Sequence, residues 1–131
     1  MRVYLDSAPI VYLVENVSPY VNYLTQRLAP EDIVQVCSEL SRLECRVKPL
    51  RDGEPALLAA FDSYFADIIA QVIPLSRSVI DLATDLRARY NFRTPDAIHL
   101  ASAIHEQCDL FLTNDFYLER CEEIPIELIP S

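Results

Sequence analysis

Five short apolar runs alternate with longer segments of helical periodicity along this 131-residue chain. Each run is too short for a buried helix and contains β-branched or aromatic residues, which favours strands. Strands that alternate with helices predict a parallel sheet with helices on both faces, an α/β fold. The expected strands are residues 2–5, 33–37, 72–73, 110–112 and 126–129, the last at a sheet edge because prolines flank it.

Length and composition narrow the class of protein. We expect a single domain, residues 1–131, because hydrophobic residues make up 51% of the chain and can form one core. No run approaches the roughly 20 apolar residues of a membrane helix, and no secretory signal is visible. Four cysteines without a C-x-x-C pair and only two histidines disfavour a zinc site. These features predict a cytoplasmic protein with reduced cysteines and no membrane partner.

The formal net charge of −9 argues against sequence-independent nucleic-acid binding over the whole surface. Seven of the eleven basic residues nevertheless fall within residues 42–51 and 87–93. A local rim that includes Arg42, Arg46 and Arg93 could hold a phosphodiester backbone. Solvated helix ends are an equally good interpretation of any single arginine.

Two carboxylates end apolar strands. Asp6 follows the first expected strand, and Asp115 follows the fourth. If these strands are neighbours where the strand order reverses, both side chains meet in one crevice at the carboxyl edge of the sheet. The alternative for Asp6 is that it only caps the helix that follows.

A third carboxylate, Glu44, lies at the edge of the stripe that Leu40, Leu43 and Val47 form at helical spacing. We expect that stripe to be buried. A carboxylate beside a buried face needs a partner, because an unpaired buried charge is costly. An arginine is the simplest partner, and a bound cation is the alternative.

The fourth carboxylate, Asp96, is near the start of a helix that begins at Thr94-Pro95. An acid there interacts favourably with the helix dipole, but Asp96 also shares a side with Leu100 and can lean inward. Four such acids, with no lysine or arginine spaced to neutralise each, favour a bound cation. Oxygen donors suit Mg²⁺ or Mn²⁺, which can orient a water, lower its pKa and bridge to a phosphate oxygen.

Further polar residues surround these acids in the sequence. The hydroxyls of Ser7 and Thr113 are expected to support the carboxylates. His99 and His105 are interpreted as ordinary helix residues, with His99 the one that could line the site.

Four segments resemble the PIN-domain ribonucleases, and most nearly the VapC-type toxins of bacterial toxin–antitoxin pairs. They are V-Y-L-D-S, S-E-L-S-R-L-E, T-P-D-A-I-H-L-A-S-A and L-T-N-D-F, in that order over nearly the whole chain. The resemblance implies a PIN-like three-layer sandwich around a five-stranded parallel sheet. It also implies a Mg²⁺- or Mn²⁺-dependent endoribonuclease that hydrolyses RNA with a metal-activated water. It assigns the catalytic and metal-binding roles to Asp6, Glu44, Asp96 and Asp115.

The same resemblance implies a partner, a small antitoxin that packs on residues 8–28. The residues there that we expect to be exposed, and to suit an antitoxin or a homodimer, are Ile10, Val11, Tyr12 and Tyr20. The family often spaces its Thr-Asn pair several residues before an Asp-Phe pair, whereas residues 113–116 are compressed, so Asn114 could share the role of Asp115. An RNA-processing PIN nuclease without an antitoxin and a non-catalytic PIN-fold module remain the alternatives.

Overall fold

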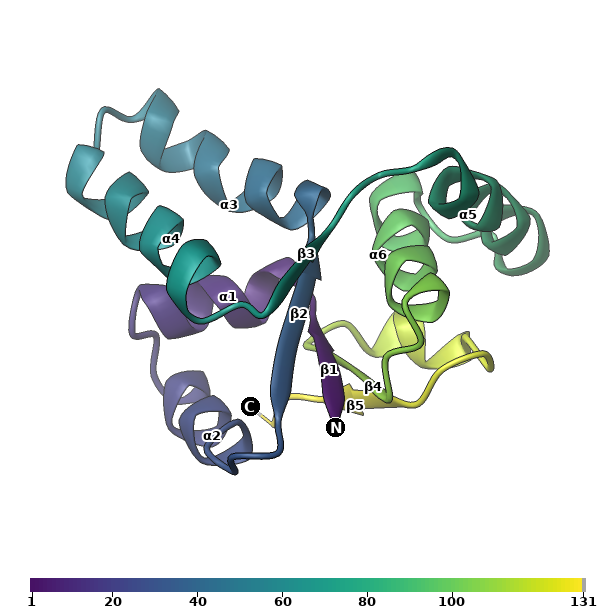
Figure 1. Ribbon diagram of the computed structural model, residues 1–131, viewed down its shortest axis with the longest axis horizontal. Coiled ribbons are helices and arrows are strands. Elements are labelled where there is room, and N and C mark those ends of the chain that lie inside the picture. Colours follow the sequence, from purple (N-terminus) through teal and green to yellow (C-terminus); the bar gives the residue numbers. More distant parts are fainter. Residues whose placement is uncertain (131) are drawn as a thin grey trace.

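The computed structural model describes residues 1–130, which form a five-stranded parallel sheet between two layers of helices (Figure 1). The strand order is β3-β2-β1-β4-β5, and every neighbouring pair is parallel. The predicted fold class and the edge position of the last strand are therefore confirmed. The strands are β1 (Arg2–Leu5), β2 (Val34–Ser38), β3 (Gln71–Ile73), β4 (Leu110–Thr113) and β5 (Ile126–Leu128).

The helices divide between the two faces of the sheet. Those that follow β1 and β2 lie on one face, and α5 and α6 lie on the other (Figure 1). The helices are α1 (Ser7–Val14), α2 (Tyr20–Arg27), α3 (Glu39–Arg51), α4 (Pro55–Asp67), α5 (Arg77–Tyr90) and α6 (Thr94–His105), with a short 3₁₀ helix η1 (Phe116–Arg120). Within residues 1–130, no helix is both long and apolar enough to cross a membrane.

Side-chain caps fix the starts of three helices. Asp6 caps α1 by accepting a hydrogen bond of 2.9 Å from the backbone N–H of Ser7. Ser38 and Ser41 form a reciprocal capping box at the start of α3, and Ser76 accepts from the third residue of α5. These caps fix the point at which each chain segment leaves the sheet.

The central strand is buried on both faces, as expected for a parallel strand between helices. Val3 and Leu5 of β1 pack into the core beneath α1 and α2, whereas Tyr4 points into the core beneath α5 and α6. The Tyr4 ring stacks on Phe111 of β4 with ring centroids 5.1 Å apart. The two cores therefore lie on opposite faces of the sheet.

The prediction that the apolar stripe of α3 is buried is wrong. Leu43 and Val47 are 62% and 51% exposed, and the buried residues of the helix are Ser41, Cys45 and Pro49. Small residues let α3 approach α1 closely, since the Cys45 thiol contacts the Ser7 carbonyl oxygen. Glu44 still turns toward the carboxyl edge of the sheet, because it neighbours this buried face.

The first two helices expose less apolar surface than the sequence suggests. Ile10 is fully buried, which contradicts its predicted exposure, and Val11 is partly buried. Tyr12 and Tyr20 are also partly buried, because their rings stack on each other with centroids 4.2 Å apart. An apolar surface for a partner is therefore more extensive on α3 than on α1.

The four cysteines are buried free thiols. Burial raises the pKa of Cys37 and Cys45 to about 12 and that of Cys108 to about 11. A thiol with a raised pKa is a poor nucleophile and a poor metal ligand. These side chains therefore act as packing groups.

Two matched leucine truncations test this packing. Leu100→Ala in α6 empties a fully buried position and should cost about 2 to 5 kcal/mol of unfolding free energy. Leu43→Ala in α3 removes an exposed side chain and should stay within about 0.5 kcal/mol. Urea denaturation of both variants measures the difference, and equal losses would contradict the packing of α3.

Candidate active site

The candidate site lies where β1 and β4 end side by side. Thr113, the last residue of β4, donates a 2.8 Å hydrogen bond from its Oγ1 to Oδ2 of Asp6, which follows β1. The chain leaves β1 and β4 in opposite directions across the sheet, so this is a topological switch point. Asp6 both caps α1 and occupies the crevice, so the two interpretations of this residue are compatible.

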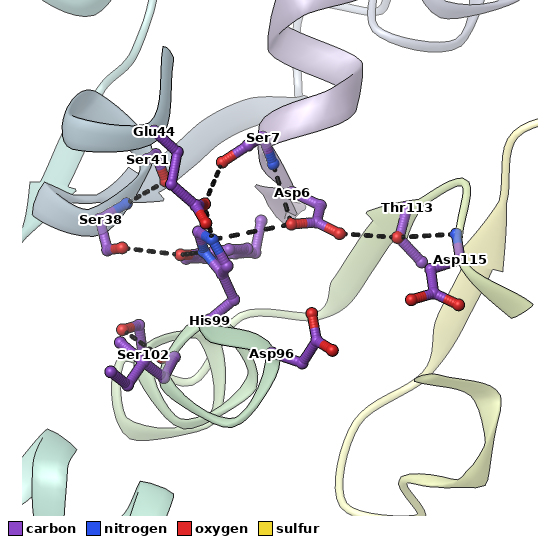
Figure 2. A network of polar contacts seen from close by, with 12 residues as sticks. Asp6, Ser7, Ser38, Ser41, Glu44, Asp96, His99, Ser102, Thr113 and Asp115 are labelled. Carbon is purple, nitrogen blue, oxygen red and sulfur yellow. Dashed lines mark hydrogen bonds and ion pairs between the residues drawn. The ribbon is translucent and has the colours of Figure 1, made fainter. Parts of the chain in front are cut away.

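The side chains of Ser7 and His99 hold Glu44 close to Asp6 (Figure 2). Its Oε1 accepts a 2.7 Å hydrogen bond from the Ser7 hydroxyl and lies 2.6 Å from Nε2 of His99. The same His99 nitrogen is 3.8 Å from Oδ1 of Asp6. Burial favours a higher pKa for Glu44, but His99 and Ser7 outweigh it and hold that pKa below its usual value.

His99, interpreted from the sequence as an ordinary helix residue that could line the site, does line it. Its ring is 2% exposed, and its Nδ1 is 2.7 Å from the Tyr4 hydroxyl, which is 2.9 Å from the Ser38 hydroxyl. Burial raises the pKa of Tyr4 far above its ordinary value, so this link stays a neutral phenol. His99 follows Asp96 by three residues and so shares its helix face, a spacing that could have identified it.

Asp96 projects from the first turn of α6 toward Asp6 (Figure 2). Burial raises the pKa of Asp96; the Arg93 guanidinium, 3.1 Å away, opposes this, and the charges of Asp6 and Asp115 reinforce it. Negative charge is therefore concentrated here with one adjacent guanidinium. The expectation that no lysine or arginine neutralises these acids is therefore wrong for Asp96.

Asp115 and Asp6 both form hydrogen bonds with the hydroxyl of Thr113. The backbone N–H of Asp115 donates a 3.1 Å hydrogen bond to Oγ1 of Thr113, and its Oδ1 accepts one of 2.9 Å from the N–H of Tyr117. The Asn114 amide instead donates to the Tyr12 hydroxyl on α1. The structure thus brings the carboxylates of four separate segments to one edge of the sheet and leaves Asn114 turned toward α1.

The three arginines proposed as an RNA rim differ in their surroundings. Arg42 pairs with Glu39 at 3.2 Å, and Arg46 pairs with Asp62 of α4 at 2.7 Å. Arg93 is the member of this set that lies among the candidate acids. It is therefore the rim residue best placed to contact a phosphate near them.

The donor set fits a hard divalent cation. Oδ1 of Asp96, Oδ2 of Asp115 and Oε2 of Glu44 accept no hydrogen bond from residues 1–130 and remain free to bind an ion. No three acid, histidine or cysteine side chains of the described residues form a ready-made cluster. Mg²⁺ does not require one, because it commonly binds through one or two carboxylates and retains several waters.

The fold and the carboxylates at its switch point define the class of protein. The sequence matches the PIN domain family over residues 3–124, so the chain belongs to that family. The predicted PIN-like fold is confirmed. No curated protein matches the sequence significantly.

Solved structures share this fold at low sequence identity. VapBC2 from Rickettsia felis, bound to a DNA fragment from its promoter, contains a chain with 16% identity and a TM-score of 0.80, over 98% of each chain. DNA-bound VapBC from Salmonella typhimurium gives 14% identity and a TM-score of 0.77, over 99% of each chain. VapC20 of Mycobacterium tuberculosis, a sarcin–ricin loop cleaving toxin, gives 14% identity and a TM-score of 0.76, over 98% of this chain and 99% of that one.

Opposite pKa shifts predict opposite effects of two amide substitutions on the metal-free protein. Glu44→Gln should cost about 1 kcal/mol at pH 7, because it removes a carboxylate that the fold holds ionised. That loss should disappear as the pH falls through the lowered pKa of Glu44.

Asp96→Asn should raise stability at pH 7, because folding opposes ionisation of this group, and the gain should vanish in acid. Thermal unfolding between pH 3 and 7 measures both variants. Equal effects of the same sign would contradict the opposite pKa shifts of Glu44 and Asp96.

Proposed function

We propose that this chain is a Mg²⁺- or Mn²⁺-dependent endoribonuclease and the toxin of a toxin–antitoxin pair. The observation that carries the proposal is the gathering of Asp6, Glu44, Asp96 and Asp115 at the switch point of a PIN fold. The sarcin–ricin loop cleaving toxin with the same fold supports RNA as the substrate. The VapBC complexes of the same fold support an antitoxin as the partner.

Each side chain has a part in this proposal. Asp6, fixed by Ser7 and Thr113, is the central acid. Glu44, Asp96 and Asp115 beside it complete the set that would hold the cation. A bound divalent ion would supply the positive charge and Lewis acidity for phosphodiester hydrolysis, which in this class leaves 5′-phosphate and 3′-hydroxyl ends. Arg93 would orient a substrate phosphate toward the acids.

Metal binding and cleavage test the activity together. Mn²⁺ should stabilise the wild-type protein by about 2.7 kcal/mol at 100 times its Kd, because it binds the native state selectively. Asp6→Asn should abolish RNA cleavage and this stabilisation, yet leave the metal-free protein at least as stable. Thermal unfolding with and without Mn²⁺, and sequencing of RNA 5′ ends, are the measurements.

The matched control is Asp81→Asn, which removes an exposed acid from α5. It should cleave RNA and bind Mn²⁺ like the wild-type protein. Mn²⁺ binding without cleavage would favour a non-catalytic PIN-fold module. Loss of stability in metal-free Asp6→Asn would instead make Asp6 a structural residue.

The partner surface in this proposal is the exposed stripe of α3, formed by Leu43, Val47 and Leu50. These side chains are 62%, 51% and 66% exposed and repeat at helical spacing. Such a stripe suits the apolar face of a partner segment. A second copy of the chain is the alternative occupant.

Co-expression with a small protein encoded by an adjacent reading frame tests this surface. Val47→Asp should prevent co-purification, because it puts a charge into the apolar contact. Ile80→Asp, at an exposed apolar position of α5, should leave co-purification intact. If the Val47→Asp variant still co-purified with the partner, the α3 stripe would be excluded as the partner surface. A mass of two copies, measured by light scattering of the chain alone, would identify a homodimer.

A further inference from the structure

A cavity of about 310 Å³ adjoins the candidate acids on the side of α6 and η1. Asp96 and Asp115 form part of its wall, so it opens directly beside the carboxylates. The remaining wall comes from the turn between α5 and α6 and from the first turn of η1. Its lining residues are Asn91, Phe92, Arg93, Asp96, Asp115 and Tyr117.

Tyr117 is an aromatic ring held in place while much of it stays open to solvent. The residue is 56% exposed, and its backbone N–H is bonded to the Asp115 carboxylate. The Arg120 guanidinium covers the Tyr117 ring at 4.2 Å from its centroid and also lies 4.9 Å from that of Phe92. This arrangement fixes the ring relative to the acids.

The other cavity groups suit a nucleotide. Arg93 has a 78% exposed side chain and can contact a phosphate, although it already pairs with Asp96. Asn91 lines the cavity and carries an amide that can donate to and accept from a base edge. The volume is at the lower end for small-molecule pockets, which fits one unstacked base and excludes a duplex.

We propose that this cavity holds one nucleobase of the RNA substrate, with Tyr117 stacked on the face of the base. Unpaired bases of RNA commonly bind proteins by stacking on aromatic side chains. A base held there fixes which phosphodiester reaches the acids, so the cavity sets the cleavage position. The proposal rests on the RNA substrate of the proposed function and adds the residues that select the cut site.

Direct binding measures the stack without cleavage. In an Asp6→Asn background, a short single-stranded RNA carrying 2-aminopurine is titrated and followed by anisotropy and by fluorescence quenching. Tyr117→Ala should weaken binding by about tenfold or more, as expected for one base–aromatic stack, and should reduce the quenching. Tyr117→Phe, which keeps the ring, should bind within about twofold of its parent.

Phe116→Ala is the matched control. Phe116 is the neighbouring aromatic residue and is 70% exposed, but it does not line the cavity. Its removal should change RNA affinity by less than about twofold. Tyr117→Leu, which keeps apolar bulk without a π-face, should behave like Tyr117→Ala, and serves if the alanine variant does not fold.

Three results would overturn the subsite. The first is an Asp6→Asn protein that binds no RNA. The second is an unchanged RNA affinity in both Tyr117→Ala and Tyr117→Leu. The third is a loss of RNA affinity in Phe116→Ala equal to that in Tyr117→Ala. A loss of self-association or of antitoxin binding in Tyr117→Ala, with RNA affinity unchanged, would make this a protein contact instead.

Wild-type protein that cleaves RNA with Mn²⁺ while the Tyr117 variants bind RNA normally would refute the subsite alone. Wild-type protein that neither cleaves RNA nor binds Mn²⁺ would refute the proposed function.

Discussion

The parallel pairing of β1 with β4 is the constraint on which the site depends. Leu5 lies opposite Leu112, so Asp6 and Thr113, which follow them, are brought within hydrogen-bond distance although they are 107 residues apart. Thr113 then contacts Asp115 as well, which ties the two strand-end acids to one hydroxyl. A shift in the register of this pair would separate them, since neighbouring residues of a strand point to opposite faces.

The acids of the site differ in their electrostatic surroundings. Glu44 is held ionised by His99 and Ser7, whereas Asp96 is held toward its protonated form by burial and by its acidic neighbours. Groups with pKa values displaced in opposite directions at one edge of a sheet are typical of functional sites. Among the described residues, this surplus of negative charge beside the exposed Arg93 guanidinium is the physical reason to propose a cation there.

The structural relatives share this fold at 14–16% identity. The layers and the strand order of such a fold depend on hydrophobic patterning and on short polar caps, which many sequences satisfy. Surface elements are freer to differ. In this chain, two such elements are the exposed α3 stripe and the Tyr117 ring beside the acids, on which the proposed partner and substrate contacts depend.

The amino-acid sequence by itself determined the strands, the starts of α1 and α6 and the identity of the four candidate acids. Those features depend on local residue spacing and capping, which are encoded in short stretches of sequence. Only the tertiary structure decided that Glu44 pairs with His99 rather than with an arginine, and that Cys45 rather than Leu43 faces the core. The periodicity of one helix cannot reveal which of its sides another helix covers. A hydrogen bond between residues 55 positions apart exists only once the sheet has brought their helices together.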